Sequence, residues 1–128
     1  MPTRGPRKTP THKESKLQAN CVRYFRLAYP KYSRLFFSVP NGAHVTYSNR
    51  KRMVAEGLVR GVCDTILAVP NQTYHGFYIE FKYGKGKLSP DQQEFIKDVM
   101  GQNYKVMVCR DFDQFRVEID KYMTTTKY

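Results

Sequence analysis

Hydrophobic residues follow two different spacings along the chain, and each spacing predicts one type of secondary structure. In some segments the apolar residues recur every three or four positions, as on one face of a helix, whereas others are short apolar or alternating runs typical of strands. The expected helices are 14–29, 50–56, 90–101 and a last one beginning at 112, and the expected strands are 35–39, 64–69, 77–83 and 104–109. This order, α-β-(α)-β-β-α-β-α, predicts an α/β fold in which a small mixed sheet is flanked by helices.

The expected helix at 90–101 has the most complete end signals. Ser89 is placed to cap it, with Pro90 at the first position and Gln92 completing a capping box. Gly101 is placed to end it. The side chains expected to face the core are Phe95, Ile96, Val99 and Met100.

The other helix starts are marked by single polar residues. The first helix could be capped by Thr11 or Ser15, and the short helix by Ser48 or Asn49. Asp111 is placed to cap the last helix. Each of these residues has a side-chain oxygen that can accept a hydrogen bond from a free N–H of the first turn.

Two central strands carry the candidate chemistry. Side chains alternate along a strand, so Glu80 and Lys82 share one face of the segment F-Y-I-E-F-K, and the other face is apolar and suited to a core. Pairing this strand with the one that starts at Asp64 would bring Asp64 close to Glu80. Two neighbouring carboxylates repel unless a cation lies between them, and a hard cation such as Mg²⁺ takes oxygen ligands. The pattern therefore predicts a magnesium site.

The formal net charge of +11 narrows the range of partners. Such an excess favours a polyanion, most often nucleic acid. The candidate phosphate contacts are Arg50, Lys51 and Arg52 in the short helix, and Lys85 and Lys87 in the loop G-K-G-K after the central strands. A solvated surface with no binding role explains the short basic helix equally well.

Composition also excludes several classes of protein. The chain has no apolar run long enough for a transmembrane helix and no secretory signal, so we expect no membrane association and a cytoplasmic location, in the host if a phage encodes it. The 3 cysteines are widely spaced and the 3 histidines form no metal-binding pattern. We expect a reduced protein without a zinc site.

The length of 128 residues predicts one domain with short tails. Residues 1–13 are rich in Pro, Thr and basic residues and are expected to be a flexible basic tail, which could also grip phosphates. The domain proper is expected at 14–122, and the C-terminus at 123–128 is expected to fray.

The ordered set of these segments resembles the stand-alone VRR-NUC domain, a branch of the PD-(D/E)xK nuclease superfamily with a restriction-endonuclease-like fold. The matching strings are E-S-K-L-Q in the first helix, the strand and turn S-V-P-N-G, G-V-C-D, E-F-K and G-K-L-S-P-D-Q. They place the residues of the motif at Glu14, Gln18, Asp64, Glu80, Lys82 and Gln92. The sequence departs from the motif at Cys63, where a proline usually stands.

The resemblance implies a Mg²⁺-dependent, structure-selective DNA endonuclease, with Mn²⁺ as a substitute ion. Members of the family include Holliday-junction resolvases, which act on branched DNA and usually work as homodimers, and many occur in phages or prokaryotes. Asp64, Glu80 and the main-chain carbonyl of Phe81 would hold the metal. Lys82 would orient the attacking water or stabilise the developing charge, and Glu14 and Gln92 would assist. The expected products carry 5′-phosphate and 3′-hydroxyl ends.

Two other functions remain open at this point. A non-catalytic nucleic-acid-binding protein would use tyrosine and phenylalanine stacking together with lysine and arginine contacts to phosphates. In that case Glu80 and Lys82 would be an ordinary solvated pair, and the capping box alone would explain Gln92. The third possibility is a structural component of a larger replication or packaging assembly.

Overall fold

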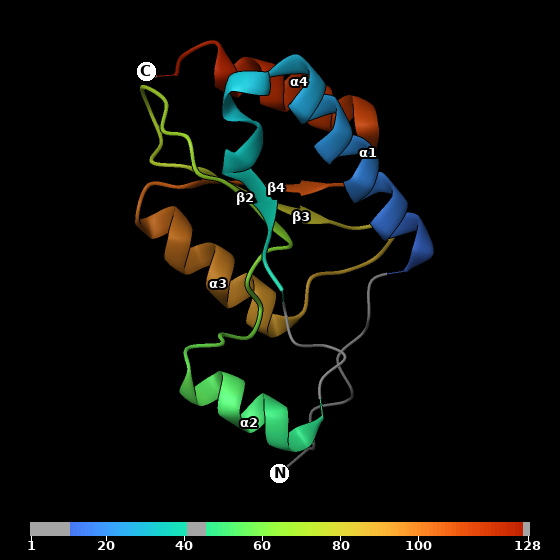
Figure 1. Ribbon diagram of the computed structural model, residues 1–128, viewed down its shortest axis with the longest axis vertical. Helices are drawn as coiled ribbons and strands as arrows, with labels where there is room; N and C mark the ends of the chain where they lie inside the picture. Colours follow the sequence, from blue (N-terminus) through green and yellow to red (C-terminus); the bar gives the residue numbers. More distant parts are fainter. Residues whose placement is uncertain (1–10, 41–45, 127–128) are drawn as a thin grey trace.

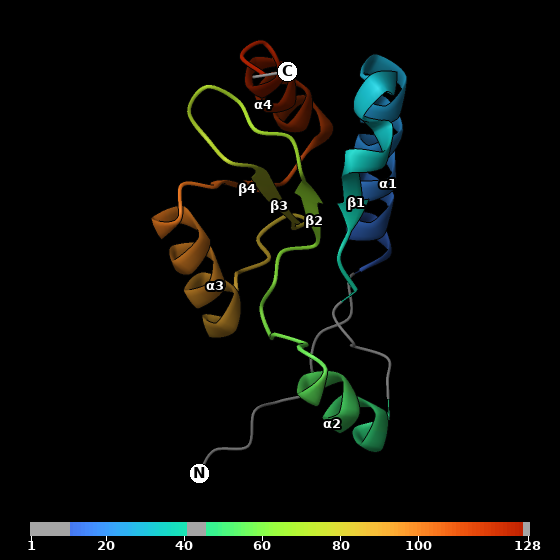
Figure 2. The same ribbon diagram turned by 60° about the vertical axis from the view of Figure 1, so that its left-hand side comes forward.

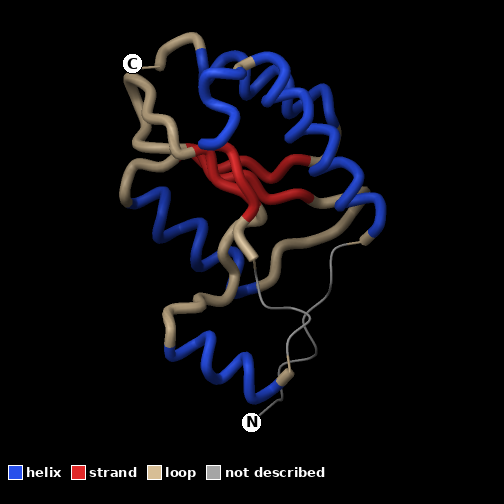
Figure 3. The backbone as a smooth tube through the Cα atoms, viewed as in Figure 1, coloured by secondary structure: helices blue, strands red, loops and turns tan. Residues whose placement is uncertain are grey.

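A mixed sheet forms the centre of the molecule. The structure is a computed structural model that describes residues 11–40 and 46–126. The sheet has four strands in the order β1-β2-β3-β4, with β1–β2 and β2–β3 antiparallel and β3–β4 parallel (Figure 3). The strands are β1 (Phe36–Ser38), β2 (Thr65–Leu67), β3 (Phe77–Phe81) and β4 (Lys105–Cys109). All four predicted strands are present, and each is shorter than its apolar run.

Helices cover both faces of this sheet, as expected. Figures 1 and 2 show α1 (His12–Ala28) and α4 (Phe112–Met123) on one side and α3 (Pro90–Gly101) on the other. A 3₁₀ helix, η1 (Pro30–Leu35), connects α1 to β1 and takes Leu35 out of the predicted strand.

Phenylalanines fill the space between the sheet and the α1–α4 pair. Phe25 of α1 lies edge-on to Phe36 of β1, with ring centroids 5.1 Å apart. Phe36 stacks on Phe115 of α4 at 5.8 Å, and Phe81 of β3 lies 6.4 Å from Phe115. All these side chains are buried, so alternate residues of β3 point into this core, as the period-two pattern predicts.

The face of β3 opposite the core carries Tyr78 and Glu80. Tyr78 meets Phe95 of α3 edge-on at 5.2 Å. Phe95, Ile96 and Val99 are half-buried on the side of α3 that faces the sheet. Met100 is 58% exposed, so the prediction that it faces the core is wrong. Helix α3 ends at Gly101, as predicted, and the left-handed residue that follows it is Asn103, with φ 66°.

The short helix α2 (Tyr47–Ala55) lies apart from the sheet and has no buried residue (Figures 1 and 2). It begins earlier than predicted because Thr46, not Ser48 or Asn49, is its cap and accepts a hydrogen bond from Asn49 N. The predicted turn at Pro40-Asn41-Gly42 falls largely outside the described residues.

Both ends of the described fold are more ordered than their composition suggests. Thr11 caps α1, which begins at His12 instead of Glu14. At the other end Met123 is buried, Gln72 N donates to Thr125 O and Thr126 pairs with Asn71. Fraying from 123 is therefore not observed up to Thr126, because main-chain hydrogen bonds hold this segment against the β2–β3 connection.

Candidate active site

The pairing of β2 with β3 brings two carboxylates together. Thr65 lies opposite Ile79, so the preceding Asp64 lies opposite Glu80. Asp64 N donates to Glu80 Oε2 at 3.1 Å, and Phe81 N donates to Asp64 Oδ2 at 2.8 Å. Each carboxylate is thus fixed by a main-chain N–H of the neighbouring strand. The expected proximity of Asp64 and Glu80 follows from this register.

Burial makes this carboxylate pair electrostatically unfavourable. Glu80 is only 3% exposed, and Asp64 is half-buried. Burial, with a further contribution from the charge of Asp64, raises the pKa of Glu80 to about 8. Burial also raises the pKa of Asp64, although the Phe81 N–H opposes this shift. A bound cation would favour the doubly ionised pair that the fold alone disfavours.

Lys82 supplies one positive charge beside this pair. Its ammonium nitrogen lies 3.9 Å from Glu80 Oε1, and its side chain is 16% exposed. It lies two positions after Glu80, on the same face of the extended chain, as the alternation predicts. The contact is long for an ion pair, so the ammonium group can also reach an anionic ligand.

Gln92 takes part in a helix cap and in the site at the same time. Its Oε1 accepts from Ser89 N at 2.9 Å, which closes the capping box of α3. Its Nε2 donates to Glu80 Oε1 at 2.8 Å. The oxygen and the nitrogen of one side-chain amide therefore have different partners. The role of Gln92 in the helix cap does not exclude its contact with Glu80.

Glu14 occupies the equivalent position at the start of α1. Its Oε2 accepts from Thr11 N at 3.3 Å in a second capping box, and its Oε1 accepts from Tyr83 N at 3.4 Å. Tyr83 directly follows Lys82, so Glu14 lies at the end of β3. Both helices begin at the site, and the partial positive charge of their first turns favours anionic groups there.

The donor set fits a magnesium ion. Mg²⁺ is usually held by one or two carboxylates and keeps several waters, and Asp64 and Glu80 provide such a pair. The N–H of Phe81 points to Asp64, and the C=O of an extended residue lies on the same side as its N–H, so the Phe81 carbonyl also faces this pair. Within residues 11–40 and 46–126, no three His, Cys, Asp or Glu side chains cluster as metal ligands.

The predicted phosphate contacts lie in two places. Lys85 and Lys87 are exposed in the loop that follows β3. A side chain at Gly86 would lie 3.7 Å from Glu14 Oε1 and 3.7 Å from the Lys82 side chain, which places this loop beside the carboxylates. The basic residues Arg50, Lys51 and Arg52 belong to α2, which lies apart from the sheet (Figure 1).

Sequence reasoning missed Arg110, which directly follows β4. Its Nη1 donates to Gly84 O at 2.9 Å and to Gly86 O at 2.8 Å, and so holds the loop that carries Lys85. An arginine after a strand has no distinctive local pattern. Only the parallel pairing of β3 with β4, which brings both strand ends together, places Arg110 against this loop.

Comparison with known proteins identifies the family. The family profile of the VRR-NUC domain matches residues 12–112, which include all the residues of the candidate site. The chain belongs to the VRR-NUC family. VRR-NUC is a nuclease domain family, so the chain carries a nuclease domain and belongs to the hydrolases. Nucleases of the PD-(D/E)xK type typically use a divalent metal, and a nuclease domain implies DNA as substrate.

A solved structure supports the fold independently. A chain described as a VRR-NUC domain protein superposes with a TM-score of 0.72 and 23% identity, over 87% of this chain and 88% of that chain. No protein with a curated description matches the sequence. No helix in the described part of the VRR-NUC chain is long and apolar enough to cross a membrane. The predicted family and α/β fold are confirmed.

Proposed function

We propose that this VRR-NUC protein is a Mg²⁺-dependent endonuclease that cuts branched or otherwise structured DNA. The observation that carries the proposal is the Asp64–Glu80 pair, in which Asp64 N donates to Glu80 Oε2 at 3.1 Å and Glu80 is also contacted by Lys82 and Gln92. Two buried acids that repel each other lower the free energy of unfolding, and a bound cation would relieve this repulsion. A strongly perturbed pKa beside a specific charge partner is typical of functional sites.

The residues of the site divide the work of phosphodiester hydrolysis. Asp64, Glu80 and the Phe81 carbonyl would hold the metal, which supplies Lewis-acid polarisation of the phosphate and neutralises its charge. Lys82 would orient the attacking water or stabilise the negative charge that develops on the phosphate oxygens. Gln92 would keep Glu80 in one orientation through its Nε2 hydrogen bond. Glu14 would act at the Tyr83 end, where it can hold a water or a second ion.

The substrate and assembly state are narrower parts of this proposal. Holliday junctions have approximate two-fold symmetry, which a homodimer with two such sites would match. Lys85 and Lys87 beside the carboxylates, and Arg50, Lys51 and Arg52 on α2, would contact phosphates on arms of the junction. Products with 5′-phosphate and 3′-hydroxyl ends are expected.

The test compares the wild type with Asp64→Ala and Lys82→Ala. Each protein is incubated with a labelled four-way junction, a flap, single-stranded DNA and a plain duplex, in Mg²⁺, in Mn²⁺ and in EDTA. We expect cutting by the wild type with either metal, and a rate lowered about 10²-fold or more by each substitution. Metal-independent binding without cutting, unchanged in Asp64→Ala, would instead support the non-catalytic DNA-binding protein.

The ranking of substrates tests the finer claim. Preference for the junction over the flap and the duplex would support a resolvase, and equal rates on all would indicate a general nuclease. Sedimentation of the metal-free protein, alone and with the junction, measures whether two copies assemble. A monomer that resolves junctions at full rate would contradict the dimer.

A further inference from the structure

A groove leads away from the candidate site between α1 and the edge strand β1. Its volume is about 690 Å³, within the range of sites for ligands of nucleotide size. It is lined by residues of α1 and β1: Ser15, Gln18, Ala19, Val22, Arg23, Arg26 and Leu27, with Phe37 and Ser38. None of these described residues carries a carboxylate, so none of them repels an anion.

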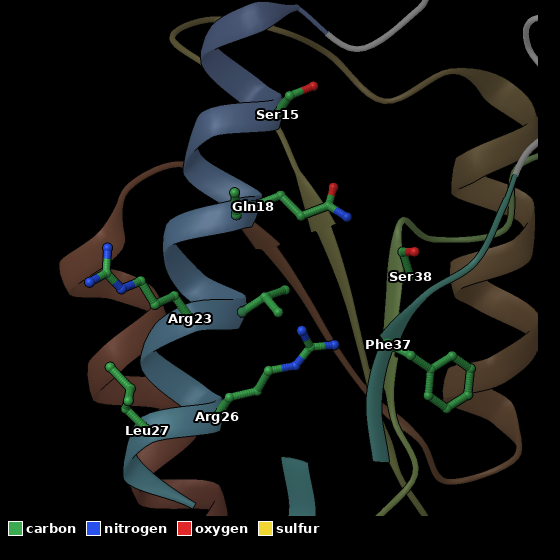
Figure 4. Close-up of a pocket in the computed structure, with 9 residues that line it drawn as sticks. Ser15, Gln18, Arg23, Arg26, Leu27, Phe37 and Ser38 are labelled. Carbon is green, nitrogen blue, oxygen red and sulfur yellow. The ribbon is translucent and has the colours of Figure 1, made fainter. Parts of the chain in front are cut away.

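Helical spacing connects this groove to the site. Glu14, Gln18, Val22 and Arg26 recur every four residues, so they form one row along α1. The row begins at Glu14, which contacts the end of β3, and ends at Arg26 about 18 Å further along the helix. Figure 4 shows Gln18 and Arg26 extending towards β1, whereas Arg23 and Leu27 point to the other side of the helix.

The opposite wall is the free edge of the sheet. Strand β1 has β2 as its only neighbour in the described sheet, and Leu35 O and Val39 N bond to Ala68 N and Asp64 O of that side. Main-chain groups alternate in direction along a strand, so those of Ser38 point away from β2, towards the groove. An N–H of this kind is a common partner of phosphate oxygens.

We propose that this groove is the track for one strand of the DNA substrate as it leaves the catalytic carboxylates, with Arg26 as a phosphate contact at its far end. The inference rests on the proposed nuclease function and adds where the substrate lies. Phosphates of one strand are about 3.4 Å apart along B-form DNA, so Arg26 meets a phosphate at most about five nucleotides from the cut. Gln18 and Ser38 contact the strand between these points.

The test uses Arg26→Ala and its matched control Arg116→Ala. Both remove one exposed arginine, so their effect on net charge is equal, but Arg116 belongs to α4 and is not among the residues that line the groove. Binding of a labelled single-stranded oligonucleotide is measured without metal at several salt concentrations, and cleavage is measured with Mg²⁺. We expect Arg26→Ala to lower the slope of log K against log salt by about 0.7 and to weaken binding about two- to fivefold. Arg26→Lys should restore most of the salt dependence and of the affinity, and Arg116→Ala should change neither.

Two further measurements distinguish loss of a DNA contact in the groove from a structural effect of the substitution. Arg26→Ala should raise KM with little change in kcat, because Arg26 does not touch the reacting bond. The difference from wild type should vanish on substrates cut back to fewer than about three nucleotides on one side of the scissile bond. If the wild type cuts and both arginine variants bind and cut alike, the track is wrong and the nuclease proposal stands.

If the proposed nuclease function itself is wrong, the experiments give a different result. If the wild type neither cuts nor binds DNA, both proposals fall. If Arg26→Ala instead changes the sedimentation coefficient and leaves DNA binding intact, the groove is a protein contact and the track is again wrong.

Discussion

Gln92 Nε2 donates a hydrogen bond to Glu80 Oε1 over 2.8 Å, while the Oε1 of the same amide closes the capping box of α3. Glu14 repeats this arrangement at α1, with one oxygen on Thr11 N and the other on Tyr83 N. In both cases the third residue of a helix has one polar atom on its own cap and one at the end of β3. The helix starts are therefore tied directly to the geometry of the carboxylates.

The double role of Gln92 can be separated experimentally. Ser89→Ala removes the cap and leaves the Glu80 contact, so we expect a loss of about 1 kcal/mol of stability and nearly unchanged cleavage. Gln92→Ala keeps the bond from its main-chain N to Ser89 Oγ but removes the bond from Ser89 N and the Glu80 contact, so we expect a smaller loss of stability together with a clear fall in kcat. Thermal unfolding and cleavage kinetics of the two variants provide the comparison. Equal kcat in both would mean that Gln92 acts only as a cap.

The buried pair predicts a pH dependence of stability in the metal-free protein. The pKa of Glu80 is about 8 when folded, above its ordinary value, so the native state binds the proton more tightly than the unfolded state does. Stability is then full below the unfolded pKa and falls as the pH rises towards 8. The loss from pH 5 to pH 8.5 should be on the order of 2–4 kcal/mol, at about 1.4 kcal/mol per pKa unit.

Denaturant unfolding at several pH values, in EDTA, measures this loss. Glu80→Gln lacks the titrating group and should flatten the profile. Added Mg²⁺ should stabilise the wild type most at high pH, where the pair is ionised, and should stabilise Glu80→Gln less. Stability that rises steadily from pH 5 to pH 8.5 in EDTA would show that Glu80 is already ionised at low pH.

Arg110 predicts an effect on substrate binding through the loop that it holds. Arg110→Ala removes the hydrogen bonds to Gly84 O and Gly86 O, which leaves Lys85 and Lys87 on an untethered segment. We expect KM to rise several-fold more than kcat falls. Both hydrogen bonds come from Nη1, and the side chain of Arg110→Lys keeps the charge but is one atom shorter, so it should restore the effect only in part. Full activity in Arg110→Ala would mean that the loop needs no tether.

Asp120 offers a test of fold stability away from the site. Tyr24 Oη donates to Asp120 at 2.8 Å and Tyr29 Oη donates at 2.6 Å, which joins α1 to α4. Asp120→Ala leaves two hydroxyls without their acceptor and should cost about 2–3 kcal/mol in unfolding free energy. Cleavage below the melting temperature should be unchanged. Tyr24→Phe is the milder control, because it removes one donor and leaves Asp120 with Tyr29.

Local patterns identified most of the fold. The alternation in F-Y-I-E-F-K predicted which residues of β3 face the phenylalanine core, and the capping box at Ser89 marked the start of α3. Two predictions at helix ends were wrong. Thr46 caps α2 in place of Ser48 or Asn49, and Met100, in the last turn of α3, is exposed.

The sequence by itself determined that Glu80 and Lys82 share one face of an extended segment, since side-chain direction along such a segment depends only on its period of two. In the structure Glu80 lies in β3, Lys82 directly follows it, and Asp64 directly precedes β2. Tertiary structure alone decided that Glu80 is buried, that one amide of Gln92 reaches it and that Arg110 holds the basic loop. Tertiary structure also forms the groove beside Arg26, between α1 and β1. These features depend on strand register and helix placement, which arise from contacts between residues far apart in the chain and leave no local pattern.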